Sequence, residues 1–124
     1  GACMAALGTK IAGVLGTNDA FIDQVKNSAS RADEPVWQLP LERDYRRLLD
    51  SNVADMRNIG GPYAGAITAA LFLSEFTAEV PWAHLDIAGP MSMDGDDGWL
   101  SRGATGFGTR LLIDLALNFS KPKR

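Results

Sequence analysis

The chain has 124 residues, enough for one domain with a single hydrophobic core. Apolar residues make up 46% of the sequence and charged residues 22%, a balance that argues against a disordered or fibrous protein. The net charge is −3 and the only basic run is the short one at residues 121–124, so charge gives no reason to expect a nucleic acid or an anionic membrane as partner.

The single cysteine and the apolar opening segment bear on the compartment. Cys3 has no partner for a disulfide within the chain, which favours the cytoplasm and leaves an exposed thiol open as an alternative. Residues 1–16 are apolar enough to suggest a signal peptide, but they lack a basic beginning and Lys10 interrupts them. We interpret this segment as core.

Apolar spacing and turn residues predict a helix, a strand and a second helix in the first third of the chain. The first helix is expected at residues 2–7, without a capping side chain before it. A buried strand is expected at residues 11–15. The second helix covers residues 20–30 and is capped by Asn18 or Asp19.

The middle of the chain is expected to be extended at residues 36–41, with Pro35 before this segment and Pro40 within it. Residues 42–51 predict an amphipathic α-helix that buries Tyr45, Leu48 and Leu49 and leaves its charged side chains in solvent.

The last half of the chain alternates helix, strand and helix. Residues 65–75 are apolar on all sides and predict a helix that is buried on most of its surface. Residues 80–87 predict the central strand of a sheet, and residues 109–119 predict a packed amphipathic helix. The pattern indicates an α/β fold, part of a mixed, mostly parallel sheet flanked by helices.

Two clusters of polar residues are candidates for chemistry. His84 is the only histidine, and Asp86 is expected on the same face of the strand, as in a catalytic triad. No Gly-x-Ser-x-Gly segment supplies a nucleophile, so we favour a structural hydrogen bond between the two. A zinc site that combines Cys3, His84 and acidic residues has no motif spacing behind it.

Two glycine-containing loops have alternative interpretations. Residues 94–98 read Asp-Gly-Asp-Asp-Gly, which resembles half of a calcium loop, but the distal bidentate glutamate is missing and a solvated loop is favoured. Residues 103–108 precede the last helix, so their backbone amides could face an anion. Tight packing between strand and helix is the favoured alternative.

Five short segments carry a family resemblance. They are Gly-Ala-Cys at residues 1–3, Val-Trp-Gln-Leu-Pro-Leu at 36–41, Ala-Asp-Met-Arg-Asn-Ile-Gly at 54–60, Trp-Ala-His-Leu-Asp-Ile-Ala-Gly at 82–89 and Gly-Ala-Thr-Gly at 103–106. In this order and at this spacing they resemble the C-terminal part of the leucyl aminopeptidases, and the resemblance covers essentially the whole chain.

The resemblance implies a function and a set of binding residues. Leucyl aminopeptidases are cytoplasmic hexamers that use two divalent metal ions, zinc or manganese, to hydrolyse the N-terminal residue from a peptide. By resemblance, Gly1, Ala88 and Met91 line the pocket for the first side chain of the substrate, and Ile59 lines the next subsite. Apolar walls select aliphatic side chains by burying them, at about 0.8 kcal/mol per methylene group.

The catalytic segment of that family, Asn-Thr-Asp-Ala-Glu-Gly-Arg, does not occur in the sequence. We therefore expect residues 1–124 to be the C-terminal part of the catalytic domain, with the metal-binding segment and an N-terminal domain upstream. No catalytic residue and no metal ligand is assigned here, and the chain alone is expected to hold no metal and to be inactive. The alternative is a non-catalytic binding or assembly module derived from an aminopeptidase.

Overall fold

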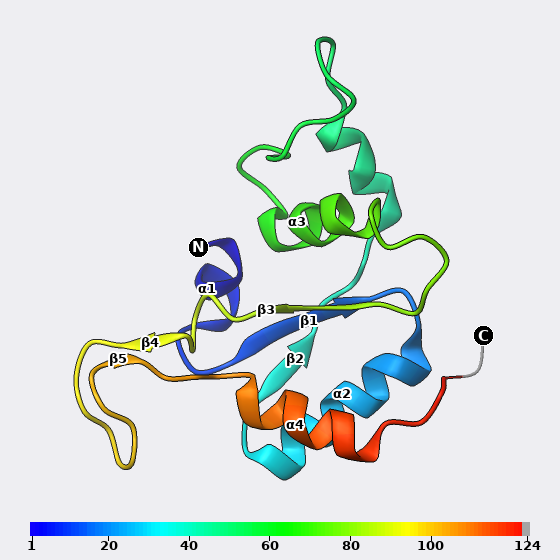
Figure 1. Ribbon diagram of the computed structural model, residues 1–124. Coiled ribbons are helices and arrows are strands. Elements are labelled where there is room, and N and C mark those ends of the chain that lie inside the picture. Colours follow the sequence, from blue (N-terminus) through cyan, green and yellow to red (C-terminus); the bar gives the residue numbers. More distant parts are fainter. Residues whose placement is uncertain (123–124) are drawn as a thin grey trace.

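The computed structural model describes residues 1–122, so part of the basic run at residues 121–124 lies outside the described residues (Figure 1). In chain order the elements are α1 (Ala2–Leu7), β1 (Ala12–Gly16), α2 (Asp19–Ala32), β2 (Val36–Gln38), the 3-10 helix η1 (Arg43–Leu49), α3 (Gly65–Ser74), β3 (Ala83–Asp86), β4 (Ser92–Met93), β5 (Gly103–Ala104) and α4 (Thr109–Asn118).

A three-stranded sheet of order β2-β1-β3 lies between two layers of helices. Figure 1 shows α1 and α3 on one side of the sheet, and α2 and α4 on the other. β1 is parallel to β2, with Ala12 opposite Val36, and antiparallel to β3, with Val14 opposite Leu85. The α/β class with a mixed sheet is confirmed, and its pairings divide equally between parallel and antiparallel.

The central strand is β1, so the prediction that residues 80–87 hold this position is wrong for the described part of the sheet. Ala12, Val14 and Leu15 are fully buried because helices cover both faces of β1. The residues of β3 are only half-buried, because β3 forms an edge.

The main core lies between the sheet and the helices α2 and α4. As predicted, Asn18 caps α2, accepting a hydrogen bond on its side-chain oxygen from the Phe21 N–H at 2.9 Å. The apolar face of α2 then packs against β1 and α4, in a cluster formed by Val14, Ile22, Val25, Ala29 and Leu111. The helical spacing predicted for residues 20–30 is confirmed.

The interpretation of residues 1–16 as core holds only in part, because Cys3 and residues 12–15 are buried while most of α1 is exposed. Cys3 on α1 is 1% exposed, and its thiol lies 3.7 Å from the Asp86 carbonyl oxygen, which it faces as a weak donor. Burial, reinforced by the Asp86 carboxylate, raises the pKa of this thiol. The alternative of an exposed, reactive thiol is therefore wrong.

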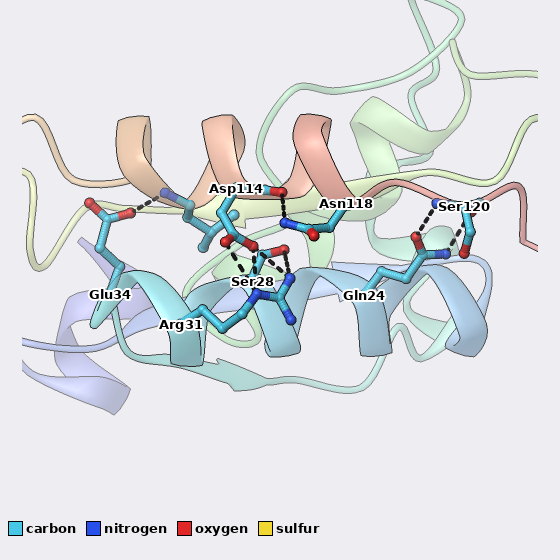
Figure 2. A network of polar contacts seen from close by, with 8 residues as sticks. Gln24, Ser28, Arg31, Glu34, Asp114, Asn118 and Ser120 are labelled. Atoms are coloured by element: carbon cyan, nitrogen blue, oxygen red, sulfur yellow. Dashed lines mark hydrogen bonds and ion pairs between the residues drawn. The ribbon is translucent and has the colours of Figure 1, made fainter.

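A line of polar contacts joins α2 to α4 along the outside of the core (Figure 2). The Arg31 guanidinium donates to the Asp114 carboxylate at 2.6 Å, and the side chain of Gln24 exchanges two hydrogen bonds with the backbone of Ser120 at 2.8 and 2.9 Å. The hydrogen bonds from Arg31 and Ser28 lower the pKa of Asp114. These contacts hold the two helices in one alignment.

The N-terminus of α4 is capped by a distant residue. No side chain at the start of α4 caps it, and Gly108 occupies the N-cap position. Instead, the carboxylate of Glu34, which follows α2 and is only 3% exposed, accepts hydrogen bonds from the Gly108 N–H at 3.1 Å and the Leu111 N–H at 2.9 Å. Arg110 adds an ion pair at 3.4 Å. A carboxylate at this end is favoured by the helix dipole.

η1 takes the place of the amphipathic α-helix predicted for residues 42–51. Leu49 is fully buried, but Tyr45 remains 37% exposed, so the predicted apolar face is buried only in part. The charged side chains are not all solvated either. Arg46 pairs with Asp50 at the end of η1 at 3.1 Å, and its second ion pair, with Glu75 at the end of α3, ties η1 to α3.

α3 is apolar as predicted, but one of its sides is open. Its Ala66, Ala70 and Leu71 are buried, while Leu73 is 41% exposed and Phe76, just after the helix, is 70% exposed. The prediction of burial on most sides is thus confirmed only for the side facing α1, β1 and η1. No helix within residues 1–122 has both the length and the apolar character needed to cross a membrane.

Replacing Glu34 by Gln in the intact protein is expected to lower the free energy of unfolding by about 1.5–3 kcal/mol, because a neutral amide weakens both bonds to the backbone of α4. Chemical denaturation measures the change. Glu79→Gln, at an exposed glutamate, is the matched control. Equal stability of the two variants would contradict the capping role of Glu34.

Candidate functional site

The proposed pocket residues Ala88 and Met91 lie in one turn between β3 and β4. The turn is closed by its own backbone, since the Met91 N–H donates to the Ile87 carbonyl at 3.0 Å and the Ala88 N–H donates to the Asp86 carboxylate at 3.2 Å. Ala88 is half-buried and the Met91 side chain is 51% exposed. Hydrogen bonds therefore fix the backbone of the turn, while the Met91 side chain remains accessible.

The turn packs against the C-terminal end of α1, where Figure 1 also shows the two segments close together. A Cβ atom at Gly89 would lie 2.2 Å from the Gly8 carbonyl oxygen, so the two backbones approach as closely as glycine allows. α1 begins after Gly1, which is exposed at its N-cap. Gly1 and the turn that holds Ala88 and Met91 thus lie at opposite ends of α1, and the structure does not bring them into contact.

Ile59 lies beside α3 instead. Its side chain is 69% exposed and lines a shallow depression of about 750 Å³ together with Phe72 and Phe76. The next residue, Gly60, packs against Thr68 of α3, where a Cβ atom would come within 2.8 Å of the threonine methyl group. The proposed roles of Gly1, Ile59, Ala88 and Met91 in substrate binding remain predictions.

The contacts of His84 and Asp86 indicate structural roles for both side chains. The imidazole of His84 stacks on Trp82, with ring centroids 6.1 Å apart, while the Asp86 carboxylate accepts from the Ala88 N–H. Burial lowers the pKa of His84, and the negative charge of Asp86 opposes that effect. Among the described hydrogen bonds none joins the two side chains, so their predicted mutual bond is not formed.

The acidic loop at residues 94–98 is exposed and organised by its own backbone. The Asp96 carboxylate accepts from the Arg102 N–H at 2.8 Å, and Asp97 and Leu100 exchange two backbone hydrogen bonds at 3.0 Å. Across residues 1–122 no group of three or more His, Cys, Asp and Glu side chains is placed to hold a metal ion.

Of the amides at residues 103–108, that of Gly108 binds a carboxylate, and this is the Glu34 carboxylate of the same chain. Spacing did not identify Glu34, because a charged residue after a predicted helix reads as solvent-exposed. Thr105 was also missed as an individual residue, although it belongs to the Gly-Ala-Thr-Gly segment. Its hydroxyl donates to the Pro90 carbonyl at 2.6 Å, directly beside Met91.

Comparison with known proteins identifies the class. Residues 1–113 match the cytosol aminopeptidase family, catalytic domain, and the chain belongs to this family. It is 48% identical over 118 residues to the probable cytosol aminopeptidase of Trichormus variabilis and 42% identical over 121 residues to that of Alkaliphilus metalliredigens. These two alignments cover 95% and 98% of this chain, but only 24% of the length of either relative.

Solved structures show the same fold. A mutant tomato leucine aminopeptidase superposes with a TM-score of 0.87 at 42% identity, over 94% of this chain and 22% of that chain. The bottromycin maturation enzyme BotP, solved in complex with Mn, also gives a TM-score of 0.87 at 42% identity, over 91% of this chain and 25% of that chain. The chain therefore spans about a quarter of the length of its relatives.

Acidification is expected to destabilise the protein through His84. Since burial lowers its pKa in the fold, the neutral ring contributes fully above the unfolded-state pKa of about 6.5, and this contribution declines as the pH falls from there toward the folded-state pKa. His84→Gln should therefore reduce the loss of melting temperature between about pH 7.5 and about pH 5.5. Parallel curves for the variant and the wild type would show that His84 does not contribute.

Proposed function

We propose that the intact protein is a metal-dependent leucyl aminopeptidase that releases N-terminal, preferably aliphatic residues from peptides, and that this chain supplies part of its substrate pocket and scaffold. Membership of the cytosol aminopeptidase family supports the reaction class. The observation that carries the proposal for this chain is the closed turn that presents Ala88 and Met91 beside α1.

The chemistry of the turn suits recognition of an aliphatic side chain. Ala88 leaves room, and the thioether chain of Met91 is unbranched and adapts to the group it contacts. A fixed backbone lowers the entropy lost when the substrate binds. With an alanine and a methionine as its facing side chains, such a wall would bury the substrate side chain rather than pair with a charge.

The catalytic metal ions of the intact enzyme would be held outside this chain. Two divalent ions, zinc or manganese, would polarise the scissile carbonyl and activate a water molecule. One relative, BotP, was solved in complex with Mn. Since residues 1–122 contain no suitable donor cluster, the role proposed for this chain is limited to substrate contact and scaffold.

A second candidate function, a non-catalytic assembly module, draws on the exposed apolar side chains of α3 and α4. Leu73, Leu112, Ile113 and Leu117 are between 41% and 81% exposed. α3 and α4 lie on opposite sides of the sheet, so these side chains form two separate faces, and exposed apolar faces are typical of interfaces. Under the aminopeptidase proposal, the rest of the polypeptide or other subunits of a cytoplasmic homohexamer would cover these faces.

The 124-residue chain produced alone is expected to hold no stoichiometric divalent metal and to have no peptidase activity, whereas the intact protein should have both. Elemental analysis after dialysis and hydrolysis of a leucine anilide with added manganese test the two properties. A tightly held metal ion with turnover in the isolated chain would contradict the assignment of the reacting groups to the rest of the protein. An intact protein without turnover would favour the assembly module.

In the intact protein, Met91→Ala should lower kcat/KM for leucine substrates by roughly 10- to 100-fold, because the apolar contact with the substrate side chain is lost while the reacting groups are unchanged. Aromatic substrates should lose less, since the pocket becomes wider. Val53→Ala, at an apolar side chain that is 96% exposed and outside the proposed pocket and the faces of α3 and α4, serves as the control. Equal losses for leucine, methionine and phenylalanine substrates would assign Met91 to folding instead of selectivity.

A further inference from the structure

We propose that Thr105 is a positioning residue for the substrate pocket, which it shapes by fixing the backbone of Pro90 and Met91. The inference rests on the proposed function, because it assigns to Thr105 the task of holding the wall that Met91 contributes. Thr105 itself is placed behind that wall and is not assigned a contact with the substrate.

Thr105 binds the turn through two groups. Its hydroxyl donates to the Pro90 carbonyl at 2.6 Å, and its backbone N–H donates to the Met91 carbonyl at 3.0 Å. The same hydroxyl oxygen accepts from the Phe107 N–H at 3.2 Å. One side chain therefore connects the turn to the residues that lead into α4.

The two glycines of the Gly-Ala-Thr-Gly segment place Thr105 in this position. Gly103 has a φ of +108° and Gly106 a φ of +68°, and both values favour glycine over residues that carry a Cβ atom. The backbone changes direction on both sides of Thr105. The two glycines of the Gly-Ala-Thr-Gly segment therefore serve to place Thr105 against the turn.

The anchor behind Thr105 is firm. Phe107 precedes Gly108, whose N–H is bound by the buried Glu34 carboxylate at 3.1 Å. The restraint thus runs from Glu34 through the start of α4 to Thr105 and on to Pro90. On the opposite side, the close approach of Gly89 to Gly8 blocks movement toward α1.

The face of the turn that Thr105 holds borders a cavity, although Pro90 itself is buried. A cavity of about 420 Å³ lies on this side, and Pro90, Met93, Thr105 and Phe107 are among its lining residues. Because side chains do not fill this space, the hydroxyl bond from Thr105 restrains Pro90 on this side, next to the backbone pairing of Ser92 with Ala104 that follows the turn. Loss of the hydroxyl would release the wall in that direction.

The test uses the intact protein and compares Thr105→Val, which keeps the shape but removes the hydroxyl, with Thr105→Ser, which keeps the hydroxyl. Thr105→Val is expected to raise KM for a leucine anilide about tenfold with little change in kcat, since a displaced wall weakens binding but leaves the reacting groups in place. The preference for leucine over phenylalanine substrates should fall. Thr105→Ser should restore both values.

Thr77→Val is the matched control. The Thr77 hydroxyl also donates to a backbone carbonyl, that of Ser74 at 2.9 Å, and is half-buried like Thr105, but it lies in the turn after α3. This variant should keep wild-type kinetics. If Thr105→Val does not fold, Thr105→Ala compared with Thr105→Ser provides the same difference of one hydroxyl.

The outcomes separate the inference from the function on which it rests. Unchanged selectivity in Thr105→Val, together with altered selectivity in Met91→Ala, would overturn the role of Thr105 and leave the proposed function standing. A fall in melting temperature with equal losses for all substrates would also overturn it, in favour of a purely structural role. An intact protein that cleaves no leucine substrate would overturn both.

Discussion

The Glu34 carboxylate connects parts of the chain that are far apart in sequence. It follows α2, yet it accepts hydrogen bonds from the Gly108 and Leu111 amides at the start of α4. Charge-assisted bonds of this kind are strong in a buried setting, and an unpaired carboxylate there would be costly. The position of α4 therefore depends on where α2 ends. The same contacts also fix the segment that leads into α4.

Several features follow from this fixed helix. Leu111 reaches the core cluster of β1 and α2, and Arg31 meets Asp114 across the outer side of the two helices. In the other direction the restraint passes to Thr105 and then to Pro90. The core and the proposed pocket wall are thus ordered by the same set of contacts, so that a change at Glu34 would reach the pocket through α4.

Much of the fold could be predicted because local signals agree with it. Asn18 is a good N-cap residue followed by apolar residues at helical spacing, and α2 forms there. The order of strands could not be predicted in the same way. Residues 80–87 are apolar enough for a central strand, but burial depends on which neighbours a strand finds, and β3 lies at an edge. Glu34 was missed because its partners lie more than seventy residues away.

The proposed site, like the strand order, could be predicted only in part from the sequence. Family resemblance directs attention to Ala88 and Met91, whose side chains would contact the substrate, but spacing says nothing of what holds their backbone. Thr105 becomes visible only when its hydroxyl is found on the Pro90 carbonyl. A pocket wall that borders a cavity on one side gains from directional bonds, and a short polar side chain between two glycines supplies them at little cost in volume. Selectivity in such a protein would depend on residues that never touch the substrate as well as on those that do.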